Sequence, residues 1–146
     1  MHSERTKILF LRISYWVGAI YDAVWVAPMV FPSLGASYFG VANFDPDPIF
    51  RYGLGAGAAL MAGWTVLLLW ADRRPVERRG VLLLTIIPVK VGLDLASLIL
   101  PVYGVIPWEK WLLTKIDAVI LYILFIFSYV HSAGLVKKRQ EGPVTI

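Results

Sequence analysis

The chain has 146 residues, of which 58% are hydrophobic and only 16% are charged, and it contains no cysteine. A soluble domain carries about 45–50% apolar and about 25% charged residues, so this composition indicates a single domain embedded in a membrane. The lack of cysteine excludes disulfides, thiolate zinc sites and cysteine nucleophiles. The net charge of +4 does not indicate a nucleic-acid partner, because the basic residues lie beside apolar segments, where membrane topology explains them.

Four apolar stretches are long enough to cross a hydrocarbon core, which takes roughly 17–25 residues. They cover residues 8–31, 52–70, 81–100 and 111–129. Backbone groups in lipid must find their partners within the segment, so each stretch should be an α-helix. The first is too long for a signal peptide and contains Asp22, so we expect it to stay in the protein. The sequence therefore predicts an all-α, integral membrane four-helix bundle.

Basic residues fall in alternate segments between these stretches. They occupy the N-terminus, the loop after the second stretch and the C-terminal tail: Arg5, Lys7, Arg73, Arg74, Arg78, Arg79, Lys137, Lys138 and Arg139. The other two loops hold Asp45, Asp47 and Glu109 against few basic residues. The positive-inside rule then predicts that both termini face the cytoplasm, in the plasma or inner membrane of the cell.

Prolines and aspartates mark the irregular parts of the chain. Pro28 and Pro88 should kink or loosen the first and third helices, because proline removes a backbone donor and crowds the preceding turn. Between the first two helices we expect an outer loop from Pro32 to Phe50. Its Asp45 and Asp47 lie next to prolines, which favours an extended loop over a calcium site.

Small residues lie four positions apart in the second stretch, in two interleaved series. The positions are Gly53, Gly55, Gly57, Ala59 and Gly63. This spacing lets helix backbones approach closely, within the chain or with a second copy. The glycine string is not a nucleotide motif, since no strand precedes it and it lies within a span.

Five ionisable residues fall within the apolar stretches: Asp22, Lys90, Asp94, Lys115 and Asp117. Charge at membrane depth is unfavourable, so such residues face protein or water and mark a candidate site. At about 1.5 Å rise per residue, Asp22, Asp94 and Asp117 lie at similar depths, in the outer half of the bilayer. Lys115 lies nearer the outer surface and is expected to extend toward it.

Helical spacing groups these residues further. Lys90 and Asp94 are four residues apart and share a face. Tyr15 shares a stripe with Asp22 on the first helix. Lys115 and Asp117 point in different directions, and Asp117 is the expected fourth member of a site with Asp22, Lys90 and Asp94.

Two interpretations of these charges compete. They form either a structural ion-pair network, helped by Arg51, or an outward-open pocket for a cation, a proton or a polar headgroup. His131 lies at the inner end of the fourth stretch, and His2 is the only other histidine, so a bis-histidine haem or zinc site is not expected. We predict no metal and no cofactor.

The layout resembles the DoxX-like group of small four-helix membrane proteins. The similarity covers most of the chain and is one of arrangement. It rests on the loop after the first helix, the start of the second at Arg51-Tyr52-Gly53, and the run from Trp70 to Pro75 before the third. The resemblance implies a membrane protein suspected of assisting redox or stress systems. It carries over no catalytic residue, and the lack of cysteine and of paired histidines weighs against direct redox chemistry.

The function that these patterns favour is binding or translocation of a small molecule, ion or proton at an intramembrane polar site, in a transporter-like or accessory subunit. One alternative is a membrane enzyme acting on a lipid or isoprenoid with a buried aspartate as acid or base. The other is a purely structural subunit that uses the glycine face of the second helix. The expected partners are the lipid bilayer, a small ligand, and either a second copy or a larger membrane complex.

Overall fold

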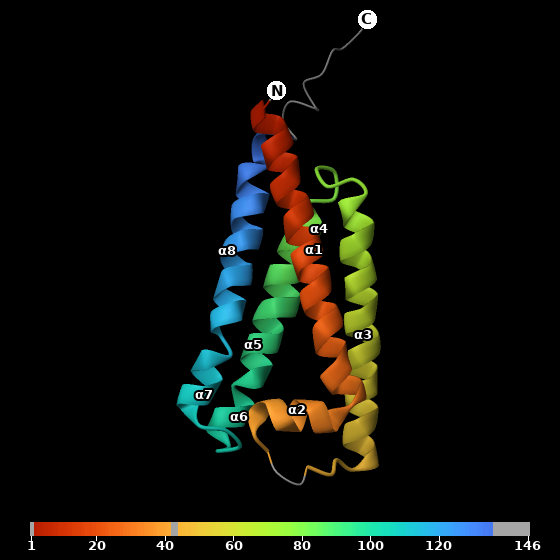
Figure 1. Ribbon diagram of the computed structural model, residues 1–146, viewed down its shortest axis with the longest axis vertical. Coiled ribbons are helices and arrows are strands. Elements are labelled where there is room, and N and C mark those ends of the chain that lie inside the picture. Colours follow the sequence, from red (N-terminus) through yellow and green to blue (C-terminus); the bar gives the residue numbers. More distant parts are fainter. Residues whose placement is uncertain (1, 42–43, 136–146) are drawn as a thin grey trace, which may run out of the picture. The chain divides into compact units, whose positions relative to one another are not determined.

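The computed structural model describes residues 2–41 and 44–135 of the chain. In that part every regular element is helical (Figure 1). Four helical stretches are long and apolar enough to cross a membrane: Glu4–Val30, Pro48–Asp72, Gly80–Val102 and Trp108–Leu135. The basic C-terminal tail, Lys137 to Arg139, lies outside the described residues.

These four stretches expose large apolar side chains on their surfaces. Leu60 is 77% exposed, Leu113 is 66% exposed and Ile123 is 64% exposed. A soluble protein rarely leaves such surfaces in water. The composition and the structure therefore agree on an all-helical protein suited to several membrane crossings.

The chain divides into two compact units. The terminal unit joins Met1–Tyr15 to Ala71–Ile146, and the central unit is Trp16–Trp70. The division falls within two helices, α1 (His2–Val30) and α3 (Pro48–Asp72), so each of these contributes to both units.

In the central unit, a short helix lies where a loop was expected. This helix, α2 (Pro32–Phe39), crosses the end of α1 (Figure 1). Pro32 suits its first turn, where the missing backbone donor has no intrahelical acceptor. Gly40 ends it in the left-handed conformation, with φ of 70°, and its amide donates to the carbonyls of Ala36 and Ser37. The extended outer loop predicted from Pro32 to Phe50 was thus only partly right.

Helix α3 begins earlier than expected, at Pro48 instead of Tyr52. The Asp47 carboxylate accepts a hydrogen bond from the amide of Phe50 at 2.8 Å, as an N-cap residue does. Proline at the first helical position completes the start signal. Asp47 therefore caps a helix, and this role explains its position between two prolines.

The glycine face of α3 is open within the central unit. A Cβ atom added at Gly53, Gly55 or Gly63 would meet no atom within 4 Å among the described residues of this unit, and one at Gly57 would lie 3.7 Å from the Met29 sulfur, an ordinary contact. Close helix packing is therefore not seen here within the unit. Packing against a second copy stays a prediction.

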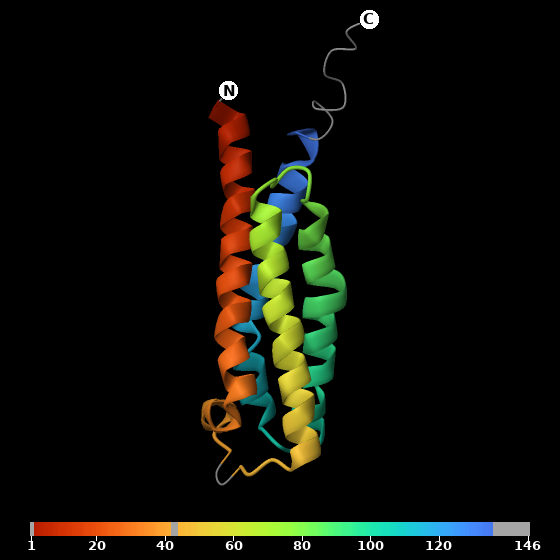
Figure 2. The same ribbon diagram turned by 90° about the vertical axis from the view of Figure 1, so that its right-hand side faces the viewer.

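The third of these candidate membrane stretches, called the third crossing below, is built from several short elements: α4 (Gly80–Leu84), η1 (Thr85–Val91), α5 (Gly92–Ser97) and α6 (Ile99–Val102). The segment η1 is a π-helix of seven residues that contains Pro88 (Figure 2, where the coil widens). Because proline has no amide hydrogen and crowds the previous turn, an α-helical pattern is interrupted there. The prediction that Pro88 loosens this helix is confirmed.

The fourth crossing is also broken. Helix α7 (Trp108–Leu113) ends in a turn, and α8 (Ile116–His131) continues from it (Figure 1). One stripe of α8 is buried, at Ala118, Leu121, Phe125 and Ser128. The serine of this stripe meets the first part of α1, where the Ser14 and Ser128 hydroxyls lie 2.7 Å apart.

Candidate functional site

The candidate site is a group of six polar or aromatic side chains in the terminal unit, here called the polar cluster. It consists of Lys90, Asp94, Ser97, Trp111, Lys115 and Tyr122. Lys90 comes from η1 and Asp94 from α5, one turn later on the same face. The expected pair is confirmed, with the Lys90 amine 3.5 Å from Asp94 Oδ1.

Asp94 is the centre of the polar cluster. Its Oδ1 atom also accepts a hydrogen bond from the Lys115 amine at 2.9 Å, and its Oδ2 atom accepts one from the Tyr122 hydroxyl at 2.8 Å. Three donors from two crossings thus converge on one carboxylate. Hydrogen bonds to a charged group are the stronger kind, so Asp94 ties the third crossing to the fourth.

A second layer holds Lys115 in place. Its amine donates to the Ser97 hydroxyl at 2.8 Å and lies 4.9 Å from the centre of the Trp111 ring. The Trp111 indole also donates to Ser97, at 3.1 Å, and Ser97 donates to the Asp94 carbonyl at 2.8 Å. The lysine is therefore oriented by an acid, a hydroxyl and an aromatic face together.

The charged members of the polar cluster are not sealed. The side chains of Lys90, Asp94 and Lys115 are 15%, 21% and 20% exposed. Charges inside an apolar crossing are expected to be covered by protein unless water or a ligand reaches them. The π-helix adjoins this cluster, and π-helical turns within α-helices occur frequently at functional sites.

Lys115 lies in the turn between α7 and α8, and not in the regular helix assumed from the sequence. Its amine binds Asp94 and also lies beside Trp111, one turn nearer the start of α7. Its expected extension toward the outer surface stays a prediction.

The other predicted site residues have different settings. Asp117 accepts a hydrogen bond from the amide of Ala118 at 2.9 Å, in the first turn of α8. Tyr15 is buried and donates to the Pro75 carbonyl at 3.3 Å. Arg51 forms an exposed ion pair with Asp45 at 2.9 Å. Asp22 is a buried residue of the central unit, so its membership in the site stays a prediction.

Some residues of the terminal unit were not expected from the sequence. Tyr122 and Trp111 carry ordinary side chains for a membrane helix, and nothing in their spacing marks them. Ser97 lies three residues after Asp94 and continues the face that Lys90 and Asp94 share. Arg12 and Asp72 form a bidentate ion pair, with contacts of 2.9 and 3.1 Å. They are 60 residues apart in the chain, so only the fold brings them together.

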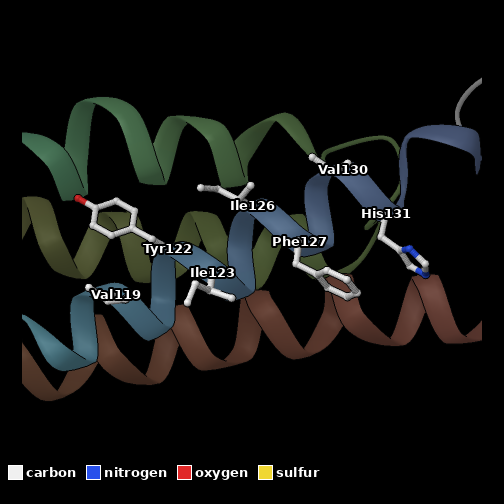
Figure 3. Close-up of a pocket in the computed structure, with 7 residues that line it drawn as sticks. All are labelled: Val119, Tyr122, Ile123, Ile126, Phe127, Val130 and His131. Carbon is white, nitrogen blue, oxygen red and sulfur yellow. The ribbon is translucent and has the colours of Figure 1, made fainter.

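A shallow apolar groove with a volume of about 520 Å³ runs along α8. Figure 3 shows Tyr122 toward one end, His131 at the other, and aliphatic side chains between them. The aliphatic lining residues are Val119, Ile123, Ile126 and Val130, and Phe127 completes the set. Tyr122 belongs to both features, since its ring lines the groove and its hydroxyl binds Asp94.

Among the residues that the structure describes, no three histidine, aspartate or glutamate side chains gather as a metal site would require. The polar cluster instead offers ammonium, hydroxyl and indole donors around one carboxylate. Comparison of the chain with models of known families, with curated proteins and with solved structures found no match.

Proposed function

We propose that the protein binds a small polar molecule inside the membrane, at the polar cluster. The observation that carries this proposal is the incomplete burial of Asp94 and Lys115 within apolar crossings. Membrane-embedded charge is a site hypothesis by default, and the neighbouring π-helix supports it. The donors around Asp94 favour a ligand with an acceptor oxygen over a cation.

Exchange of hydrogen-bond partners explains how such a ligand binds. Asp94 accepts from Lys90, Lys115 and Tyr122. An incoming oxygen takes the Lys115 amine, while Lys90 and Tyr122 keep Asp94 satisfied. No buried charge is left without a partner during this exchange, which keeps the desolvation penalty low.

Our proposal includes a membrane orientation. The basic loop from Arg73 to Arg79 lies on the cytoplasmic side with both termini, and the polar cluster opens toward the outer side of a four-helix bundle in the cell membrane. Support comes from the positive-inside rule and from Trp108, which suits the outer interface. Membership of the DoxX-like group and a role beside a larger complex stay predictions.

Chemical access to the polar cluster tests the proposed function. The chain has no native cysteine, so Ser97→Cys gives a single thiol inside the cluster. In lipid nanodiscs, a small water-soluble anionic methanethiosulfonate should modify it, and hexanoate should slow the reaction. Ser128→Cys, at a position only 1% exposed, serves as the sealed control, and Ser33→Cys serves as the exposed control.

The outcome separates a binding site from a structural network. If Ser97→Cys reacts as slowly as Ser128→Cys, the polar cluster is closed to water and only ties the helices together. If it reacts but hexanoate gives no protection, the cluster is wet and does not bind a carboxylate, and the proposed exchange at Lys115 is wrong.

A further inference from the structure

The groove along α8 and the polar cluster form one continuous feature through Tyr122. The ring of Tyr122 lines the groove (Figure 3), and its hydroxyl donates to Asp94 at 2.8 Å. The same carboxylate binds the Lys115 amine at 2.9 Å. The shallow apolar groove therefore ends beside a partly buried ammonium group.

The dimensions of the groove suit one lipid chain. From Val119 to His131, α8 rises about 18 Å at about 1.5 Å per residue. Half of a hydrocarbon core is about 15 Å thick, so the groove is about as long as one leaflet. Its lining comes from a single helix, and its volume is about 520 Å³.

The depth of Lys115 distinguishes its ligand from ordinary phospholipid. Lys115 lies about 10 Å along the helix from Trp108, where this crossing begins. Headgroups of bulk phospholipid lie outside the hydrocarbon core, so they do not reach this depth. A single-chain acid is small enough at its head to do so, and its carboxylate matches the charge of Lys115.

We propose that the polar cluster and the α8 groove together bind a long-chain carboxylate, with the carboxylate at Lys115 and the chain toward His131. This inference rests on the proposed function and names its ligand class. Tyr122 has two roles in this binding mode. Its hydroxyl keeps Asp94 paired when Lys115 turns to the ligand, and its ring covers the first carbons of the chain.

Photo-crosslinking tests this assignment in phosphatidylcholine nanodiscs. The probes are palmitic acid with a mid-chain diazirine and its methyl ester, which has the same chain and no charge. Mapping by mass spectrometry should find the acid on residues 119–131 at least several-fold above the ester. Lys115→Gln should reduce labelling by the acid to the ester level, whereas Lys110→Gln, a matched change in α7, should not.

A groove variant separates chain binding from headgroup binding. Ile123→Trp fills the groove away from the polar cluster, so it should lower labelling by the acid while hexanoate still protects the Ser97→Cys thiol.

Equal labelling by acid and ester in the parent protein would show that the groove holds bulk lipid chains, and this would overturn the inference without any variant. If hexanoate still protected Ser97→Cys in that case, the proposed function would stand. If hexanoate failed as well, both proposals would be wrong.

Discussion

Asp94 accepts hydrogen bonds from three side chains, and two of its donors are lysines. Removing one partner of a buried ion pair costs about 3–5 kcal/mol, and partial exposure lowers this figure. We expect Asp94→Ala to lower the free energy of unfolding by about 3 kcal/mol. Lys115→Ala should lower it by about 1–2 kcal/mol, because Asp94 keeps Lys90 and Tyr122.

The double variant measures the coupling energy between Asp94 and Lys115. Asp94→Ala/Lys115→Ala should lose about 1–2 kcal/mol less than the sum of the single changes, since contacting residues do not act independently. Unfolding in mixed micelles by dodecyl sulfate measures all three values. The exposed pair of Arg51 and Asp45 is the control, where Arg51→Ala should change stability by about 0.5 kcal/mol or less. Additive losses at Asp94 and Lys115 would mean that this ion pair contributes no stability.

The sequence predicts only part of the contacts in the polar cluster. The pairing of Lys90 with Asp94 follows from their spacing of four residues on one helix. The pairing of Lys115 with Asp94 depends on the turn between α7 and α8, and no proline or glycine within residues 108–115 announces that turn. Tyr122 was unpredictable because its partner lies 28 residues earlier in the chain.

Two glycines of the central unit should respond to alanine in opposite ways. Gly40 ends α2 with φ of 70°, a conformation that alanine adopts only with strain of about 1–2 kcal/mol. Gly63 lies within α3, and an added Cβ there meets nothing within 4 Å among the described residues of its unit. We expect Gly40→Ala to destabilise the protein by about 1 kcal/mol and Gly63→Ala to stabilise it by up to about 1 kcal/mol.

The same micelle unfolding assay measures both variants, and cross-linking should be run beside it. If Gly63→Ala destabilised the protein and reduced cross-linked dimers, a second copy would pack closely on this face. That result would support the close helix packing that the small-residue spacing predicts.

Helices α1 and α8 are joined by a hydrogen bond between buried serines. The hydroxyls of Ser14 and Ser128 lie 2.7 Å apart, and both also approach the Phe10 carbonyl. A double-mutant cycle with alanine at both positions should give a coupling energy of about 0.6 kcal/mol, which is typical of hydrogen bonds between membrane helices. A coupling near zero would mean that each serine is satisfied by the Phe10 carbonyl alone.

Elements were easier to predict than their ends. The four helical stretches that are long enough to cross a membrane follow from apolar length, and the loosening of the third follows from Pro88. The fold differs from the prediction at α2. Pro32 and Gly40 are start and stop signals for a short helix, and a length criterion for membrane crossings does not detect so short a helix. The early start of α3 follows from Asp47 and Pro48, a capping pattern that was available in the sequence.

For the whole molecule, the proposed orientation is testable with single cysteines. Glu77→Cys in the basic loop should resist an impermeant thiol reagent in intact cells, while Ser33→Cys and Glu109→Cys should be labelled. The four alternating crossings and the positive-inside rule predict this pattern. Labelling of Glu77→Cys from outside, with protection of the other two, would reverse the topology and the direction in which the site opens.

In the proposed binding mode, Lys115 exchanges Asp94 for the acceptor oxygen of a ligand. Carbon-13 NMR of lysine Cε atoms in nanodiscs reports on this exchange, with Lys115→Arg to assign the resonance and hexanoate as the probe. We expect a saturable shift of the Lys115 signal, a smaller shift of Lys90, and no shift of Lys110. A Lys115 resonance that stays fixed at saturating hexanoate, or that moves no more than the Lys110 resonance, would contradict it.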